Sequence, residues 1–118
     1  MTVEEYKDLL KKEKRNKYGN KKTVVGEITF DSKKEANRYN ELLMLERAGQ
    51  IRNLRLQVPF ELLPPYGGER GIKYIADFFY IENDKGVVED VKGYRTDVYK
   101  IKRKLFKFKY KDIDFREI

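Results

Sequence analysis

The sequence predicts a single domain of α/β (α+β) class, in which helices and strands follow one another along the chain. Three segments carry apolar residues at helical spacing, and five are rich in β-branched and aromatic residues, as strands are. Their order is helix, strand, helix, three strands, helix, strand. A chain of 118 residues is long enough for one core and short for two. We therefore expect one domain over residues 1–118, with an N-terminal helix and basic arm in 1–22 and the core in 23–118.

The helix boundaries rest on capping signals. Apolar residues over 3–14 predict a short first helix. Ser32 and Glu35 have the capping-box spacing, so a second helix should begin there and end at Gly49. Thr96 can cap a third helix. The apolar stripe of the third helix is predicted to consist of Val98, Ile101, Leu105 and Phe108.

The strands are predicted from runs of β-branched and aromatic residues between turn signals. Pro59 suggests that its strand lies at a sheet edge or carries a bulge. The turn at 82–86 should join the strands on either side of it into a hairpin. The expected strands are 23–30, 54–63, 73–81, 87–92 and 113–116.

The hairpin carries a candidate site. If it closes symmetrically around Asn83 and Asp84, then Asp77 and Asp90 face each other on one side of the sheet. Opposed carboxylates with apolar neighbours repel each other, and a cation would relieve the conflict. Lys92, on the face of Asp90, supplies part of that charge, and a divalent metal could supply the rest. The alternative is that both carboxylates point outward, with Lys92 and Asp90 forming a weak surface pair.

The composition excludes several kinds of chemistry. The chain has no Cys and no His, so disulfides, zinc sites built on those ligands and His acid–base catalysis are ruled out. Catalysis would need carboxylates, lysines, hydroxyls or a metal with oxygen ligands, for which Mg²⁺ and Mn²⁺ are suited. Lys and Arg number 27 against 20 Asp and Glu, and the net charge of +7 favours a nucleic-acid partner.

The sequence also suggests where the protein works. It contains no apolar run as long as a membrane span, and its start is acidic, unlike that of a signal peptide. We therefore expect a soluble intracellular protein that does not act at a membrane.

Three short segments together resemble a known family. They are Asp77 within 74–78, Asp90-Val91-Lys92 within 88–93, and Glu35 within 30–36. With these residues the chain resembles the PD-(D/E)XK nuclease superfamily, and in particular its small phage-encoded members, the Holliday junction resolvase-like endonucleases. In one departure from the family's motif, Ala76 stands before Asp77 where the family often has Pro.

The resemblance implies a fold and an activity. The fold would be a restriction-endonuclease-like αβββαβ core over residues 31–118, a mixed central sheet flanked by helices. The activity would be Mg²⁺- or Mn²⁺-dependent endonuclease cleavage of branched or double-stranded DNA, by a phage-encoded protein in the cytoplasm of a bacterial host. Symmetric cleavage of a four-way junction needs two active sites, so a homodimer would be expected.

The resemblance also implies roles for individual residues. Asp77 and Asp90 would bind the metal, with Glu35 and the backbone carbonyl of Val91 as further ligands. Lys92 would orient the attacking water or stabilise negative charge. Glu35 could instead serve only as the capping-box residue of its helix. Gln57 is a further candidate to line the site.

Basic residues suggest where nucleic acid would lie. The basic residues of the N-terminal arm could contact phosphates or could belong to a solvated linker. The basic residues of the third helix could likewise contact phosphates or simply form its solvated face. A non-catalytic basic nucleic-acid-binding protein remains the alternative function. The candidate contacts are Lys14, Arg15, Lys17, Lys21, Lys22, Lys100, Arg103, Lys104 and Lys107.

Overall fold

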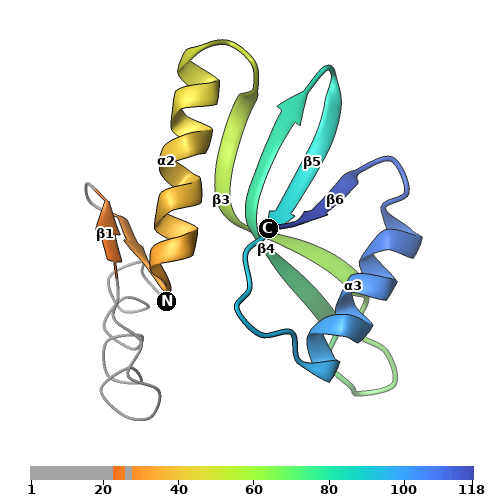
Figure 1. Ribbon diagram of the computed structural model, residues 1–118. Coiled ribbons are helices and arrows are strands. Elements are labelled where there is room, and N and C mark those ends of the chain that lie inside the picture. The colour runs from red at the N-terminus through yellow and green to blue at the C-terminus, as the bar shows by residue number, and fades with distance from the viewer. Residues whose placement is uncertain (1–22, 26–27) are drawn as a thin grey trace. The chain divides into compact units, whose positions relative to one another are not determined.

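The computed structural model describes residues 23–25 and 28–118 (Figure 1). The chain divides into two compact units, Met1–Arg38 and Tyr39–Ile118, and each is described by itself. The expected N-terminal helix over 3–14 and the basic arm with Lys14, Arg15, Lys17, Lys21 and Lys22 lie outside the described residues. The single-domain expectation stays a prediction.

The described part of the first unit begins with two short strands. β1 (Thr23–Val25) pairs antiparallel with β2 (Ile28–Phe30). The sequence predicted one strand over 23–30, which was wrong. The two runs pair with each other, Val25 opposite Ile28, so they are antiparallel neighbours and not one continuous strand.

Helix α2 (Lys33–Arg47) begins and ends where the capping signals predicted. The Ser32 side-chain oxygen accepts a hydrogen bond from the Glu35 backbone N–H at 3.1 Å. After the last turn, Gly49 adopts a positive φ of 75° and its N–H donates to the Glu46 carbonyl. Glycine adopts this left-handed conformation without a steric penalty, so it is well suited to end the helix.

The second unit contains a four-stranded mixed sheet (Figure 1). β3 (Arg52–Leu63), β4 (Ile72–Glu82) and β5 (Lys85–Asp90) are antiparallel neighbours. β6 (Asp114–Glu117) lies parallel to β5, and α3 (Asp97–Lys109) makes the crossover between them. The sheet order β3-β4-β5-β6 makes β3 an edge strand, as Pro59 predicted. No helix in the described part of the chain is long and apolar enough to cross a membrane.

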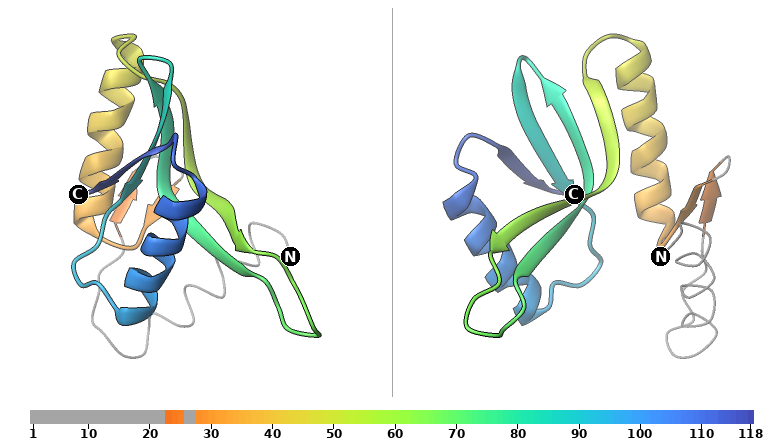
Figure 2. Two further views of the ribbon diagram at one scale, coloured as in Figure 1. Left: turned by 90° about the vertical axis from the view of Figure 1, so that its right-hand side faces the viewer. Right: turned by 180° about the vertical axis from the view of Figure 1, so that it is seen from behind.

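The core of the second unit is built largely from aromatic side chains. Phe106 of α3 contacts Phe60 of β3 and Tyr74 of β4, with ring centroids 5.0 and 5.5 Å apart. The same cluster includes Tyr99, which is buried, and Phe115, which is partly buried. Figure 2 shows α3 beside the lower halves of β3 and β4, which extend beyond the end of β5.

The predicted apolar stripe of α3 was wrong at three of its four positions, since only Leu105 packs against the core. Val98, Ile101 and Phe108 are 64%, 61% and 75% exposed, whereas Tyr99 and Phe106 are buried. Tyr99 and Phe106 are seven residues apart and share a helix face. Tyr99 and Phe106 therefore form the face of α3 that packs in the core, with Leu105 partly buried beside them.

The β4–β5 hairpin has the predicted symmetric turn. Asn83 and Asp84 both have positive φ, 51° and 60°, as a two-residue type I′ turn requires. The register runs from the pair Glu82–Lys85 to the pair Phe78–Glu89. The last pair of this register, Phe78 with Glu89, directly precedes Asp77 and Asp90 along the two strands, and the predicted pairing of Asp77 with Asp90 themselves stays a prediction.

The β3–β4 pairing is distorted beside this site. Gln57 adopts a left-handed φ of 52°, which is strained for a residue with a side chain. Regular pairs lie on either side of it, Leu56 with Phe78 and Val58 with Ala76. Beyond it, Tyr74 and Phe79 both pack in the α3 core although they are five residues apart. Strict alternation would put them on opposite faces, so the strand pattern is interrupted near Asp77.

Candidate active site

Asp77 is a buried carboxylate near the end of the β4–β5 pairing, with both of its oxygens engaged. Its Oδ2 accepts a hydrogen bond from the Val91 backbone N–H at 2.8 Å, and its Oδ1 lies 3.4 Å from Gln57 Nε2. Burial raises the pKa of Asp77 to about 6, against the lowering effects of the Val91 hydrogen bond and the Lys92 charge. The charge of Asp90 raises it further, so the two carboxylates interact electrostatically.

Asp90 is fully buried at the end of β5 and has one unsatisfied oxygen. Its Oδ2 accepts a hydrogen bond from the Tyr74 hydroxyl. Its Oδ1 has no hydrogen-bond partner among the described residues, and Lys92 Nζ lies 3.9 Å from it. Burial raises the pKa of Asp90, opposed by the Tyr74 hydrogen bond and by Lys92. A buried acceptor without a partner is unfavourable and calls for an explanation, such as a bound ion.

The structure therefore brings Asp77, Asp90 and Lys92 together. Asp77 and Asp90 are 7% and 0% exposed, so the alternative in which both point into solvent does not hold. The Lys92 side chain is 38% exposed, so its ammonium group lies between the buried Asp90 and the surface.

Val91 contacts Asp77 through its backbone, and Gln57 contacts it through its side chain. Val91 contacts it through its N–H group, so the expected role of its carbonyl as a metal ligand stays a prediction. Gln57 reaches Asp77 with its side-chain amide. The strained backbone of Gln57 faces the interruption in β4, and strain of this kind is concentrated at functional sites.

Glu35 belongs to the first unit, on the first turn of α2. It is 5% exposed, and its backbone N–H takes part in the Ser32 cap. The cap therefore uses the backbone of Glu35, and the metal-binding role of its carboxylate stays a prediction.

Sequence reasoning missed Tyr74. Its hydroxyl donates to Asp90, and burial together with that hydrogen bond raises the Tyr74 pKa far above its usual range. Tyr74 lies three residues before Asp77, and strand alternation would place the two on opposite faces. The sequence holds no signal for the interruption that brings the Tyr74 hydroxyl to Asp90 on the side where Asp77 lies.

Sequence reasoning also missed a polar cluster around Glu117 of β6. Glu117 accepts hydrogen bonds from Arg95, from the Tyr99 hydroxyl at 2.8 Å, and from Arg103 at 2.9 Å. Arg103 was predicted to contact nucleic acid, but here it is held by an ion pair within the protein.

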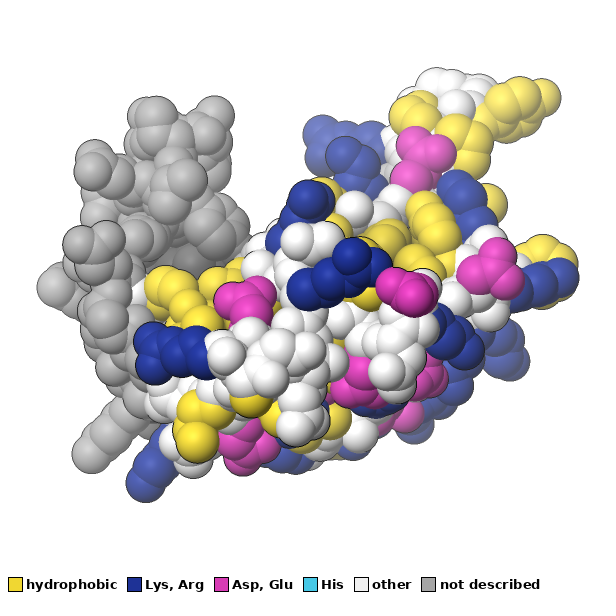
Figure 3. All heavy atoms as spheres, turned by 90° about the horizontal axis from the view of Figure 1, so that it is seen from above, with side chains coloured by type: hydrophobic (Ala, Val, Ile, Leu, Met, Phe, Trp, Pro, Cys, Tyr) yellow, Lys and Arg dark blue, Asp and Glu magenta, His cyan; other side chains and the backbone are white. Residues whose placement is uncertain are grey.

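The other predicted cations on α3 differ in their surroundings. Lys107 Nζ lies 5.6 Å from the centre of the Phe115 ring, while Lys100 and Lys104 are exposed. On the face drawn in Figure 3, basic and acidic side chains are intermixed rather than gathered into one patch. The net charge alone therefore does not locate a binding surface.

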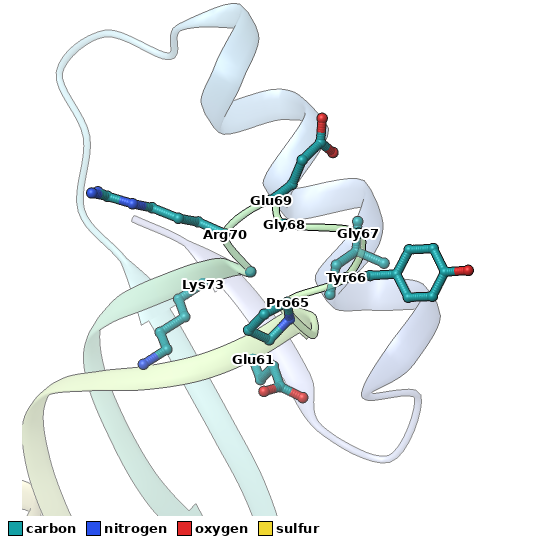
Figure 4. A pocket seen from close by; sticks show the side chains of 10 residues that line it. Glu61, Pro65, Tyr66, Gly67, Gly68, Glu69, Arg70 and Lys73 are labelled. Carbon is teal, nitrogen blue, oxygen red and sulfur yellow. The ribbon is translucent and has the colours of Figure 1, made fainter.

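The described part of the second unit carries at least two pockets. The larger, about 760 Å³, is formed by the loop between β3 and β4. Figure 4 shows Arg70 and Lys73 extending to one side of this loop and Tyr66 to the other. The smaller, about 390 Å³, is lined by Tyr74 and Lys92, both of which contact Asp90.

The acidic pair fits one kind of metal site. Within residues 23–25 and 28–118, no group of three or more carboxylates is arranged to hold a metal ion. Magnesium is commonly held by one or two carboxylates, with waters and substrate phosphates completing the shell. The unpartnered oxygen of Asp90 beside Asp77 matches that pattern.

The fold and site together define a mixed α+β protein whose four-stranded sheet carries two buried aspartates beside a lysine. The chain belongs to the family described as "Protein of unknown function (DUF1064)", which matches residues 15–118. No curated protein and no solved structure matches the chain.

Proposed function

We propose that the protein is a Mg²⁺- or Mn²⁺-dependent DNA endonuclease of the PD-(D/E)XK type, which hydrolyses phosphodiester bonds. One observation carries the proposal: Asp90 Oδ1 is buried without a hydrogen-bond partner, next to Asp77 and 3.9 Å from Lys92 Nζ. A purely structural aspartate would have both oxygens satisfied, whereas a carboxylate prepared for a cation keeps one open.

The order of elements supports the proposal. The segment α2-β3-β4-β5-α3-β6 follows the helix, three strands, helix, strand order that the family resemblance implies. The strands β4 and β5 carry Asp77, Asp90 and, just after β5, Lys92, which are the positions that the Asp…Asp-x-Lys motif occupies in that family.

The residues of the site have distinct roles in this proposal. Asp77 and Asp90 hold the cation, and Asp90 offers the open oxygen. When bound, Mg²⁺ would lower the pKa of a water molecule and offset charge on the phosphate. Lys92, whose ammonium group reaches the surface, orients the water or stabilises negative charge on the phosphate oxygens.

Supporting groups fix the two carboxylates in position. The Val91 N–H and the Gln57 amide orient Asp77, and the Tyr74 hydroxyl orients Asp90. Glu35 and the Val91 carbonyl keep the ligand roles that the family resemblance gives them, as predictions.

The substrate we propose is branched DNA, by analogy with the junction resolvases that the sequence resembles. A homodimer would supply the two active sites that symmetric junction cleavage needs. The same analogy makes the protein a phage product that works in the cytoplasm of a bacterial host.

A non-catalytic basic nucleic-acid-binding protein is the second candidate. The net charge of +7 and the exposed Lys100 and Lys104 favour it. It offers no reason for burying two aspartates, since negative charges do not help to bind a polyanion.

A cleavage assay separates the two candidates. Purified protein is incubated with Mg²⁺ and with linear, single-stranded, flapped and four-way DNA, alongside the variants Asp90→Asn and Lys92→Met. Asp84→Asn is the matched control, because it removes a carboxylate from the same hairpin at a site 92% exposed. We expect the wild type and the control to cleave and the two site variants to bind DNA without cleaving it. If the wild type leaves all four substrates intact with Mg²⁺ and with Mn²⁺, the enzyme proposal is rejected.

A further inference from the structure

The smaller pocket, beside Lys92, has an unusual balance of charge. Three lysines, Lys73, Lys92 and Lys102, line it, and no acidic residue of the described chain does so. Lys92 is paired with Asp90, so Lys73 and Lys102 give this pocket of about 390 Å³ its net positive charge. The larger pocket on the β3–β4 loop has Glu61 and Glu69 as well as its basic residues, so its charges offset one another.

The pocket also presents aromatic and apolar surface. Tyr94, on the segment between β5 and α3, is 81% exposed at its rim, and Ile75 is 52% exposed. Exposed aromatic rings beside cations are typical of sites that take nucleotides, because the ring stacks on a base while the cations hold phosphates.

The N-terminal turn of α3 borders the same pocket through Thr96 and Val98. This helix has 13 residues, and its first backbone N–H groups carry partial positive charge. They add to the attraction that the lysines exert on an anion.

The pocket is continuous with the candidate active site. Lys92 lines it and lies 3.9 Å from Asp90 Oδ1. Tyr74 also lines it and donates its hydroxyl hydrogen to Asp90 Oδ2. Two of the side chains that contact Asp90 therefore form the wall of the pocket.

We propose that this pocket binds the nucleotide next to the phosphodiester that is cut. Lys73 and Lys102 hold the phosphate of that nucleotide, and Tyr94 stacks on its base. The position of the pocket beside the cut bond rests on the proposed nuclease function. The inference adds Lys102 to the DNA contacts predicted on α3, which were Lys100, Arg103, Lys104 and Lys107. Recognition of this kind is independent of base sequence, because every base has a stacking face.

The test measures binding apart from cleavage. Fluorescence anisotropy of a fluorescein-labelled single-stranded oligonucleotide is recorded in EDTA over a range of salt concentrations. The variants are the double substitution Lys73→Gln/Lys102→Gln, Tyr94→Ala and Tyr94→Phe. Lys85→Gln, at the β4–β5 turn, controls for loss of charge. Tyr66→Ala controls for loss of an exposed tyrosine, since Tyr66 is 88% exposed on the other pocket.

Each variant has an expected result. The double lysine variant should lower the slope of log Kd against log salt by about 0.7, the value for one phosphate contact on a single strand. Tyr94→Ala should weaken binding by at least about fivefold. Tyr94→Phe, which keeps the ring, should bind within about twofold of wild type, and both controls should stay close to it.

Two results would overturn the proposal that this pocket binds a nucleotide. One is an unchanged salt slope in the double lysine variant together with unchanged affinity in Tyr94→Ala. The other is an equal loss of affinity in Tyr66→Ala. If the wild type cuts DNA in Mg²⁺ while these binding results appear, only the pocket fails. If the pocket variants lose binding in EDTA but the wild type cuts nothing, the pocket is a nucleotide site and the nuclease proposal fails.

Discussion

Replacing Asp90 with asparagine should stabilise the protein while destroying its activity. The carboxylate is fully buried, and its Oδ1 has no hydrogen-bond partner in the described part of the chain. Leaving a buried polar atom unsatisfied costs about 1–3 kcal/mol, and more when it is charged. Burial accordingly raises the pKa of Asp90, which means that the folded state disfavours its ionised form. Asparagine has nearly the same shape and no charge, so the desolvation cost falls.

The expected gain can be put in measurable terms. In EDTA at pH 7, Asp90→Asn should raise the free energy of unfolding by about 1 kcal/mol, because the charge is removed while a buried polar atom remains. For a domain of this size that corresponds to a rise in Tm of several degrees. Circular dichroism at 222 nm during heating measures it, with Asp84→Asn as the exposed control that should melt close to wild type.

Magnesium should reverse the order of stability. A cation that binds only the folded state stabilises it by RT ln(1 + [Mg²⁺]/Kd), about 1.4 kcal/mol at ten times Kd. The wild type should gain this amount and Asp90→Asn should gain nothing. If Asp90→Asn melts below the wild type in EDTA, the carboxylate is a satisfied structural group and the reasoning fails.

Three further predictions concern the groups around the site. Tyr74→Phe removes the hydroxyl that orients Asp90. The kcat for DNA cleavage should therefore fall about tenfold or more, while the affinity for DNA in EDTA stays unchanged. A kcat equal to that of the wild type would show that Tyr74 has no positioning role. For Glu117, partial burial raises the pKa, but hydrogen bonds from Tyr99, Arg95 and Arg103 outweigh it, so the pKa is lowered. The ion pairs of Glu117 therefore stabilise the fold above about pH 4.3, and this stabilisation is lost as the pH falls through the lowered pKa. In denaturant titrations, Glu117→Gln should be less stable than wild type at pH 7 and equal to it near pH 2. In the same titrations, Phe106→Ala should lower the free energy of unfolding by about 3–5 kcal/mol because the ring is fully buried. Phe108 is 75% exposed, so Phe108→Ala should lower it by less than about 1 kcal/mol. Similar losses in the two variants would contradict the observed orientation of α3.

Features governed by local chemistry could be predicted from the sequence. Ser32 and Gly49 determine the two ends of α2 through a side-chain acceptor and a left-handed backbone. Asn83 and Asp84 tolerate the positive φ of a type I′ turn, and that turn sets the register from Glu82–Lys85 to Phe78–Glu89, next to Asp77 and Asp90. These signals act within a few residues, so no knowledge of the tertiary structure was needed.

Features that depend on tertiary packing could not be predicted. The spacing of Val98 and Ile101 describes a helical stripe as well as that of Tyr99 and Phe106 does, and only the shape of the sheet decides between them. The contact between Tyr74 and Asp90 depends on an interruption in β4, opposite the left-handed Gln57. Glutamine has no special preference for that conformation, so the sequence carries no sign of it.

The central claim is that Asp77 and Asp90 together hold a divalent cation, and Mn²⁺ binding tests it most directly. Isothermal titration of Mn²⁺ into the wild type, Asp77→Asn, Asp90→Asn and Asp84→Asn compares the four proteins under one condition. The account predicts saturable binding by the wild type and Asp84→Asn, and its loss in the two site variants. Binding by Asp90→Asn equal to that of the wild type, or no binding by the wild type, would contradict it.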